Sequence, residues 1–308
     1  MRRPGTILIA GPTASGKSAL ALAVAEQRGG VIVNADSMQV YRDLRILTAR
    51  PTPEEEAQVP HRLYGHIGAG EPYSVARWLD EVKLVLEEEA RRPIIVGGTG
   101  LYFEALTKGL AAIPPIPGEI REGLRTAAEA MGTKTMHARL LAKDPAMGAR
   151  LRASDPQRVL RALEVLEATG RSLAQWQAEK KAPPLLPLEE AIGIVLSPPK
   201  EVLYPAIDAR FARMVAEGGE EEVRHLLALK LPDNASIYKA MGVAPILGFI
   251  GGLFGREEAV ALGQKASRHY AKRQGTWLRS KMIAWKWYEE QYSERLEQDI
   301  LAFMTHKG

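Results

Sequence analysis

The residues Gly11-Pro-Thr-Ala-Ser-Gly-Lys17-Ser18 have the types and the spacing needed to hold a phosphorylated ligand. They fit the P-loop pattern G-x-x-x-x-G-K-[ST], in which backbone N–H groups surround phosphate oxygens, the lysine adds a positive charge and the hydroxyl binds a metal ion. An apolar run, 6–10, precedes the loop, and a segment without Gly or Pro, 18–26, follows it. The flanks predict a strand, a turn and a helix N-terminus, which together bind anions. The loop alone does not distinguish ATP from another diphosphate ester.

A candidate for acid–base chemistry, Asp36, directly follows the apolar run 31–35. Because the carboxyl ends of parallel strands line the ligand crevice, we expect this carboxylate near the P-loop. It could bind magnesium, or act as a general base toward a group within hydrogen-bond reach. A structural role in an Asx turn or a helix N-cap is the alternative.

Two further candidates follow later apolar runs. The run 93–96 leads into Gly97-Gly98-Thr99-Gly100, where a P-loop ATPase or GTPase usually has an acidic metal ligand. The sequence therefore argues against a nucleotide hydrolase and predicts that the Thr99 hydroxyl faces the crevice, although the glycines also suit a tight turn. Arg210 and Arg213 follow the run 191–196, and an arginine beside a P-loop can clamp a diphosphate. Most helix arginines are only solvated, which is the alternative for this pair.

The elements that position these residues follow a βαβ rhythm. Four apolar runs, 6–10, 31–35, 93–96 and 191–196, and a weaker fifth, 62–67, predict parallel strands separated by helices such as 78–91. Between the proline-rich segments 113–118 and 182–187 the sequence is helical in character. We expect an α/β fold with a P-loop NTPase-like parallel sheet core, 1–115 and 190–308, and an inserted all-helical subdomain, 116–189.

Composition restricts the class of protein. The 308 residues include no cysteine, which excludes disulfides, thiolate metal sites and a catalytic thiol. The chain enters its first strand almost at once and has no apolar run of membrane-spanning length, so we expect a cytoplasmic protein without a signal peptide or membrane contact. The net charge is only +4, but seven Lys or Arg and no Asp or Glu lie between Ala259 and Tyr288.

This basic stretch has a helical pattern. At 100° per residue, five cations fall within about 60° of one another on one face: Lys265, Arg268, Lys272, Arg279 and Lys286. Three aromatic residues fall on another face and are expected to pack on the core: Tyr270, Trp277 and Tyr288. A row of cations without acids favours a phosphate backbone over a merely solvated face, although Gly275 could interrupt the helix.

Taken together, five segments in order, 11–18, 36–42, 97–102, 155–164 and 271–279, resemble the bacterial tRNA dimethylallyltransferases, also called tRNA isopentenyltransferases. The resemblance runs from residue 5 to about residue 285. It implies that the P-loop holds dimethylallyl diphosphate. The prenyl group would then move to N6 of the adenosine 3′-adjacent to the anticodon, position 37, in tRNAs reading codons that start with U, with release of diphosphate and magnesium. The target base would be flipped out of its stack.

The resemblance also implies residue roles. Asp36 would take the proton from N6, and the catalytic set would be Asp36, Thr99 and Arg210. The diphosphate would be bound by Gly11, Thr13, Ala14, Ser15, Gly16, Lys17 and Ser18, with the Ser18 hydroxyl on Mg²⁺. The tRNA would contact Asp36, Ser37, Met38, Gln39, Thr99, Arg121, Gln157, Arg158, Val159, Leu160, Arg161, Lys239, Lys272, Arg273 and Arg279. From spacing alone, Arg158 and Arg161 could equally be ion-pair partners of Glu164 and Glu167.

Two other functions fit parts of the sequence. A small-metabolite kinase would use the P-loop for ATP, and a non-catalytic RNA-binding module would use only the basic face. A kinase does not need the basic C-terminal row, and an inert module has no reason to keep Asp36, Lys17 and Thr99 converging on one crevice. In one departure from the family pattern, Gly242-Val-Ala-Pro245 lacks the glutamate that members often have. We expect a monomer, because binding tRNA gives no reason to require a second chain.

Overall fold

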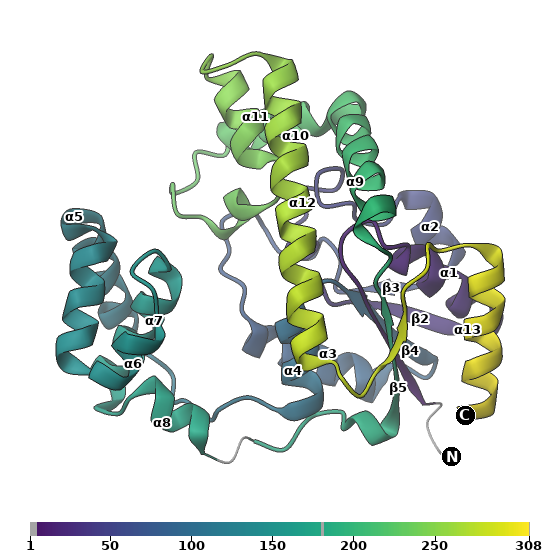
Figure 1. The fold of residues 1–308 in the computed structure, drawn as a ribbon, viewed down its shortest axis with the longest axis horizontal. Helices are drawn as coiled ribbons and strands as arrows, with labels where there is room; N and C mark the ends of the chain where they lie inside the picture. Colours follow the sequence, from purple (N-terminus) through teal and green to yellow (C-terminus); the bar gives the residue numbers. More distant parts are fainter. Residues whose placement is uncertain (1–4, 180–181, 308) are drawn as a thin grey trace. The chain divides into compact units, whose positions relative to one another are not determined.

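The computed structural model describes residues 5–179 and 182–307. Within them, one sheet contains six parallel strands in the order β3-β2-β4-β1-β5-β6 (Figure 1). Their bounds are β1 Thr6–Ala10, β2 Gly30–Asn34, β3 His61–Arg62, β4 Arg92–Gly97, β5 Ala191–Leu196 and β6 Lys286–Tyr288. The predicted parallel α/β fold is confirmed, and each of the four strongest apolar runs forms a strand.

The two edge strands differ from the prediction. Within the predicted segment 62–67, only Arg62 belongs to a strand, β3. Ile67 instead forms an isolated bridge with Tyr41. β6 was not predicted, because its residues continued the helical pattern of the basic stretch. Lys286 pairs with Ile194 of β5, so Lys286 and Tyr288 lie on a strand and not on a helix.

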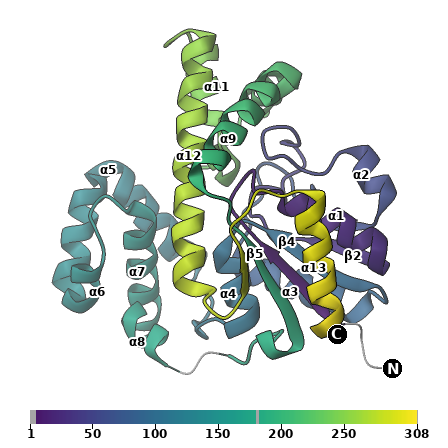
Figure 2. The same cartoon turned by 45° about the vertical axis from the view of Figure 1, so that its right-hand side comes forward.

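Helices cover both faces of the sheet, which explains why its strands are almost continuously apolar. Ile7 and Ile9 point to the face covered by α1 (Lys17–Arg28) and α13 (Glu294–Lys307). Leu8 and Ala10 point to the face covered by α3 (Val75–Glu88), α4 (Gly100–Lys108) and α12 (Arg256–Lys281). Figures 1 and 2 both show α13 alongside α1.

A third apolar cluster lies beyond the carboxyl ends of the strands, around the connection 40–49. It packs against α9 (Lys200–Met214), α10 (Glu220–Ala228) and α11 (Val243–Ile250). The shorter elements are α2 Pro53–Gln58, η1 Leu188–Glu190, η2 Val215–Gly219 and η3 Ser236–Lys239. None of the helices in the described residues is both long and apolar enough to cross a membrane.

The chain divides into two compact units. The sheet and its helices form the first, up to Thr107 and from Leu185 onward, and the second spans Lys108–Pro184. The second unit is all-helical, with α5 Gly118–Lys143, α6 Pro145–Arg150, α7 Pro156–Thr169 and α8 Leu173–Ala178 around its own core. This unit starts and ends earlier than the predicted 116–189, so it includes the proline-rich segment before α5 and excludes the residues after Pro184.

Candidate active site

The P-loop links β1 to α1 and depends on backbone conformations that glycine allows. Gly16 has φ 88°, in the left-handed region, and its carbonyl accepts the N–H of Leu20 at 3.0 Å to begin α1. A Cβ on Gly11 would lie 2.6 Å from the carbonyl oxygen of Leu196, so this position has no room for a side chain. The loop therefore brings the N-terminus of α1 to the carboxyl ends of β1 and β5.

A cavity of about 290 Å³ lies beside this loop, within the first unit. Ten of the predicted site residues line it: Thr13, Lys17, Ser18, Asp36, Ser37, Met38, Gln39, Arg210, Lys239 and Arg273. Its other walls are mostly apolar and were not predicted: Leu47, Thr48, Ala49, Ile207, Phe211, Met214, Met241, Ser267 and Tyr270. Segments far apart in the sequence thus enclose one space with a cationic end and apolar walls.

The cationic end is formed by Lys17 and Arg210. Lys17 Nζ donates to the carbonyl of Pro12 at 3.3 Å, and Arg210 donates to the Thr13 hydroxyl. Burial and, next, the positive charge of Arg210 lower the pKa of Lys17 from 10.5 to about 8, against the opposing effect of Asp36. The positive charges of Lys17 and Arg210 repel each other, and a diphosphate bound between them would relieve the repulsion.

Asp36 faces the same cavity just after β2. Its Oδ1 accepts the N–H of Met38 at 3.0 Å, which is an Asx turn, and the turn does not use Oδ2. The structural and the functional interpretations of Asp36 are therefore compatible. Gln39 supports the opposite wall, because its amide nitrogen donates to the carbonyls of Thr48 at 2.9 Å and Ala49 at 2.8 Å.

Thr99 lies behind the cavity wall and does not line it, which corrects the expectation that its hydroxyl faces the crevice. Its Oγ1 accepts the N–H of Ser37 at 3.0 Å and is hydrogen-bonded to the Tyr270 hydroxyl. Tyr270 does line the cavity, whereas the sequence predicted that it packs on the core. Burial and the charge of Asp36 raise the pKa of Tyr270, so its hydroxyl keeps its proton.

The glycines around Thr99 allow α12 to approach. A Cβ on Gly98 would lie 2.1 Å from Gln274 Nε2, and one on Gly100 would lie 2.0 Å from Trp277 Cε3. Gln274 Oε1 accepts the N–H of Thr13 at 2.9 Å, and its Nε2 donates to the carbonyl of Gly98 at 3.0 Å. This buried side chain joins the P-loop to the loop after β4. It was missed because nothing in its local pattern indicates a contact 261 positions away.

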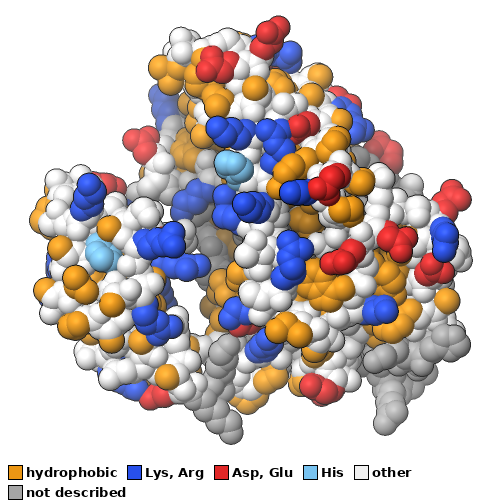
Figure 3. Space-filling view, viewed as in Figure 1, with side chains coloured by type: hydrophobic (Ala, Val, Ile, Leu, Met, Phe, Trp, Pro, Cys, Tyr) orange, Lys and Arg blue, Asp and Glu red, His pale blue; other side chains and the backbone are white. Residues whose placement is uncertain are grey.

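The basic row on α12 is shorter than predicted. Arg268 forms a two-oxygen ion pair with Asp208, at 2.5 and 2.6 Å, and Lys286 lies on β6. Lys272 and Arg279 are exposed and line a separate groove of about 520 Å³ next to Pro12. Figure 3 shows Lys and Arg side chains recurring over the part of this face where α12 lies in Figure 1.

In the helical unit, some of the residues predicted to contact tRNA are exposed and others are buried. Arg121 on α5 and Gln157 and Arg158 on α7 are exposed. Arg158 pairs with Asp155 at 3.4 Å, and Arg161 pairs with Glu164 at 3.3 Å. Val159 is 0% exposed in the core of this unit, and Leu160 packs against the same core. The prediction that Val159 contacts tRNA does not extend to its side chain, which has no accessible surface.

The cavity fits a metal ion only if a substrate supplies most of its ligands. Among residues 5–179 and 182–307 no group of three or more His, Asp or Glu side chains could hold a metal. Ser18 offers a hydroxyl to the cavity, and Asp36 offers a carboxylate. Magnesium commonly binds through one or two protein oxygens, substrate phosphates and water, so this donor set suits an ion carried by a diphosphate.

The parallel sheet, the P-loop and the carboxylate beside it define a P-loop transferase. Comparisons with known proteins specify it further. The family models described as "IPP transferase" and "Isopentenyl transferase" match residues 39–281 and 4–68. The tRNA dimethylallyltransferase of Nitrobacter hamburgensis is 50% identical over 94% of this chain and 92% of its own. That of Azorhizobium caulinodans is 52% identical over 92% and 91%.

Two solved structures are also similar. The full-length tRNA isopentenylpyrophosphate transferase of Bacillus halodurans has a TM-score of 0.70 at 31% identity, covering 98% of this chain and 96% of its own. A eukaryotic dimethylallyltransferase described as acting on tRNA has a TM-score of 0.73 at 25% identity, covering 89% and 69%. The chain belongs to the IPP transferase family and is a tRNA dimethylallyltransferase-type prenyltransferase. The comparisons do not support a small-metabolite kinase.

Proposed function

We propose that this chain transfers the dimethylallyl group of dimethylallyl diphosphate to N6 of adenosine 37 in tRNAs reading codons that start with U, and releases diphosphate. The observation that supports it is the combination in one 290 Å³ cavity of Lys17 and Arg210 with the carboxylate of Asp36. A weak amine needs a base when it attacks an allylic carbon, and the departing diphosphate needs positive charge. Both needs are met within this space.

Each group has a defined part in the proposed reaction. Gly11 and the P-loop residues from Thr13 to Ser18 would hold the diphosphate together with Arg210, and Lys17 would counter its charge. Mg²⁺ held by the Ser18 hydroxyl would neutralise further charge on the leaving group. The N6 nitrogen forms a bond to C1 of the prenyl group as the C1–O bond breaks, and the electron pair leaves with diphosphate. Asp36 Oδ2 accepts the proton that N6 loses. Thr99 supports the site by holding Ser37 and Tyr270.

The tRNA would be held by cations in both units. In the sheet unit, Lys239 and Arg273 line the cavity. Lys272 and Arg279 share an exposed face of α12. In the helical unit, we propose that Arg121, Gln157, Arg158 and Arg161 contact RNA. The chain would act as a monomer in the cytoplasm, where its tRNA substrate is found.

Replacing Asp36 tests this mechanism. Asp36→Asn keeps an oxygen that can accept the Met38 N–H but removes the base, so turnover of labelled dimethylallyl diphosphate into unmodified tRNA should fall by at least about 10²-fold. Asp36→Ala should abolish turnover while tRNA binding survives. Asp233→Asn, an exposed carboxylate in the loop after α10, is the matched control and should retain full activity. Normal turnover in both Asp36 variants would exclude this residue as the base.

A further inference from the structure

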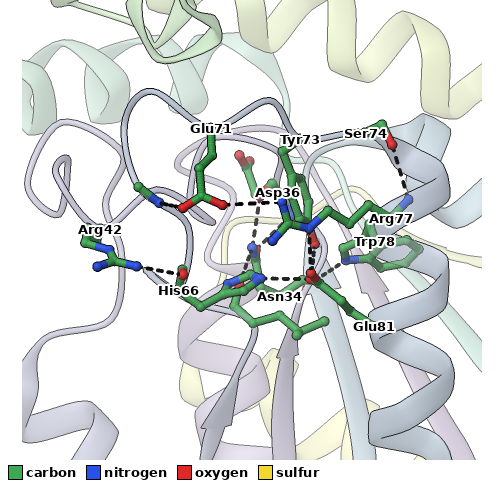
Figure 4. A network of polar contacts seen from close by, with 12 residues as sticks. Asn34, Asp36, Arg42, His66, Glu71, Tyr73, Ser74, Arg77, Trp78 and Glu81 are labelled. Atoms are coloured by element: carbon green, nitrogen blue, oxygen red, sulfur yellow. Dashed lines mark hydrogen bonds and ion pairs between the residues drawn. The ribbon is translucent and has the colours of Figure 1, made fainter. Parts of the chain in front are cut away.

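Asn34, the last residue of β2, holds both backbone polar groups of Asp36 with one side chain. Its Oδ1 accepts the N–H of Asp36 at 2.7 Å, and its Nδ2 donates to the carbonyl of Asp36 at 2.9 Å (Figure 4). Asn34 is 0% exposed, so water does not compete for these bonds. The amide cannot be turned over, because its nitrogen would then face an N–H and its oxygen would face carbonyls.

Other elements hold Asn34 in turn. The second hydrogen of Nδ2 reaches the carbonyl of Leu63 at 3.0 Å, and the Trp78 indole N–H donates to the Asn34 carbonyl at 2.7 Å. Leu63 has φ 64°, a conformation that costs free energy for a leucine and persists only where the surroundings hold it. Trp78 is fully buried on α3 and stacks on Tyr102 with ring centroids 4.5 Å apart.

The loop that contains Leu63 is fastened to α3 by Glu81. This carboxylate accepts the Tyr73 hydroxyl at 2.5 Å, His66 Nε2 at 2.8 Å and Arg77 Nε at 3.0 Å (Figure 4). The loop and the helix that hold Asn34 are therefore joined to each other by hydrogen bonds. Since the Asx turn already engages Asp36 Oδ1, fixing the Asp36 backbone also fixes the direction of Oδ2.

We propose that Asn34 is a positioning residue that acts through Asp36, holding its backbone so that Oδ2 stays aimed at the reacting amine. This inference rests on the proposed role of Asp36 as the base. Asn34 itself does not line the cavity, and its side chain bonds to the backbone of Asp36 and Leu63 rather than to the cations that face the diphosphate. Its loss should therefore impair proton transfer without weakening the hold on diphosphate.

The test uses Asn34→Asp in the full chain. This variant keeps the shape but removes both N–H donors, so that a carboxylate oxygen faces the carbonyls of Asp36 and Leu63. A misplacement of about 1 Å at a reacting group costs about 10²-fold in rate. We expect kcat to fall by about that factor, while KM for dimethylallyl diphosphate changes by less than about twofold. Asn234→Asp, the same exchange at an exposed loop position, should change neither.

A double-mutant cycle separates positioning from general destabilisation. If Asn34 acts through Asp36, adding Asn34→Asp to Asp36→Asn should not lower the residual single-turnover rate further. Trp78→Phe, which removes the donor to the Asn34 carbonyl together with part of the buried ring, serves if Asn34→Asp does not fold, and should also lower kcat without raising KM. Multiplicative losses in the cycle, or a kcat equal to wild type in these variants, would overturn the inference. Full activity of Asp36→Ala would instead refute the proposed function.

Discussion

Replacing Gln274 with leucine should destabilise the sheet unit and loosen the P-loop. The Gln274 side chain is buried at 6% exposure and forms hydrogen bonds to the N–H of Thr13 and the carbonyl of Gly98. A buried polar group left without a partner costs about 1–3 kcal/mol, so two of them give about 2–6 kcal/mol. Because Thr13 is partly exposed, water can serve its N–H in the variant, and we expect the lower half of this range.

Gln264→Leu on the same helix is the matched control. Gln264 makes one hydrogen bond, to the carbonyl of Asp208 at 3.0 Å, and is partly exposed. Its loss should cost only about 0.5–1.5 kcal/mol. Urea denaturation measures both free energies of unfolding, and calorimetry with inorganic diphosphate should show an affinity about tenfold weaker for Gln274→Leu alone, equivalent to about 1.4 kcal/mol. Equal destabilisation by the two variants, with unchanged diphosphate affinity, would refute a bridging role for Gln274.

Two further predictions concern charge. Since the pKa of Lys17 is about 8 without ligand, and a bound diphosphate raises it, diphosphate affinity should fall by up to about tenfold per pH unit above 8, with proton uptake on binding. Calorimetry at pH 8.5 in buffers of different ionisation enthalpy measures that proton uptake. If no proton were taken up, Lys17 would not be the group that titrates when diphosphate binds. Lys272→Ala with Arg279→Ala should weaken tRNA binding and reduce the slope of log K against log salt by about 1.4–1.8. Lys83→Ala with Arg91→Ala, the same charge loss on α3 and before β4, should leave the slope unchanged. If the two double variants had the same slope, the α12 cations would contact solvent and not RNA.

The parts of the site that sequence could predict are those held by local geometry. The P-loop needs only a strand, a turn with left-handed Gly16 and a helix N-terminus, and all three lie within adjacent residues. Asp36 could be placed because parallel strands end at the same edge of a sheet. The observed strands β1 and β5 have the predicted bounds, because short apolar runs rich in β-branched residues predict buried strands.

The parts that sequence could not predict depend on partners distant in the chain. Arg268 has the spacing of an RNA-binding cation, but Asp208, 60 positions earlier, neutralises it. Lys286 fits the helical face only while the helix is assumed to continue, and α12 ends at Lys281. Val159 belongs to a motif that matched residue by residue, yet its side chain fills the core. Helical periodicity shows which residues share a face, and tertiary packing decides what that face contacts.

The geometry of α12 connects the two substrates of the proposed reaction. Tyr270, Gln274 and Trp277 recur at intervals of four and three residues, so they share the inner face of the helix and reach the cavity, the P-loop and the loop after β4. Lys272 and Arg279 are seven residues apart and share an exposed face. Because an α-helix is stiff over this length, RNA bound to the outer cations would be held in a fixed relation to the diphosphate cradle. A variant that tilts α12, and not only one that removes a contact, should therefore impair both substrates together.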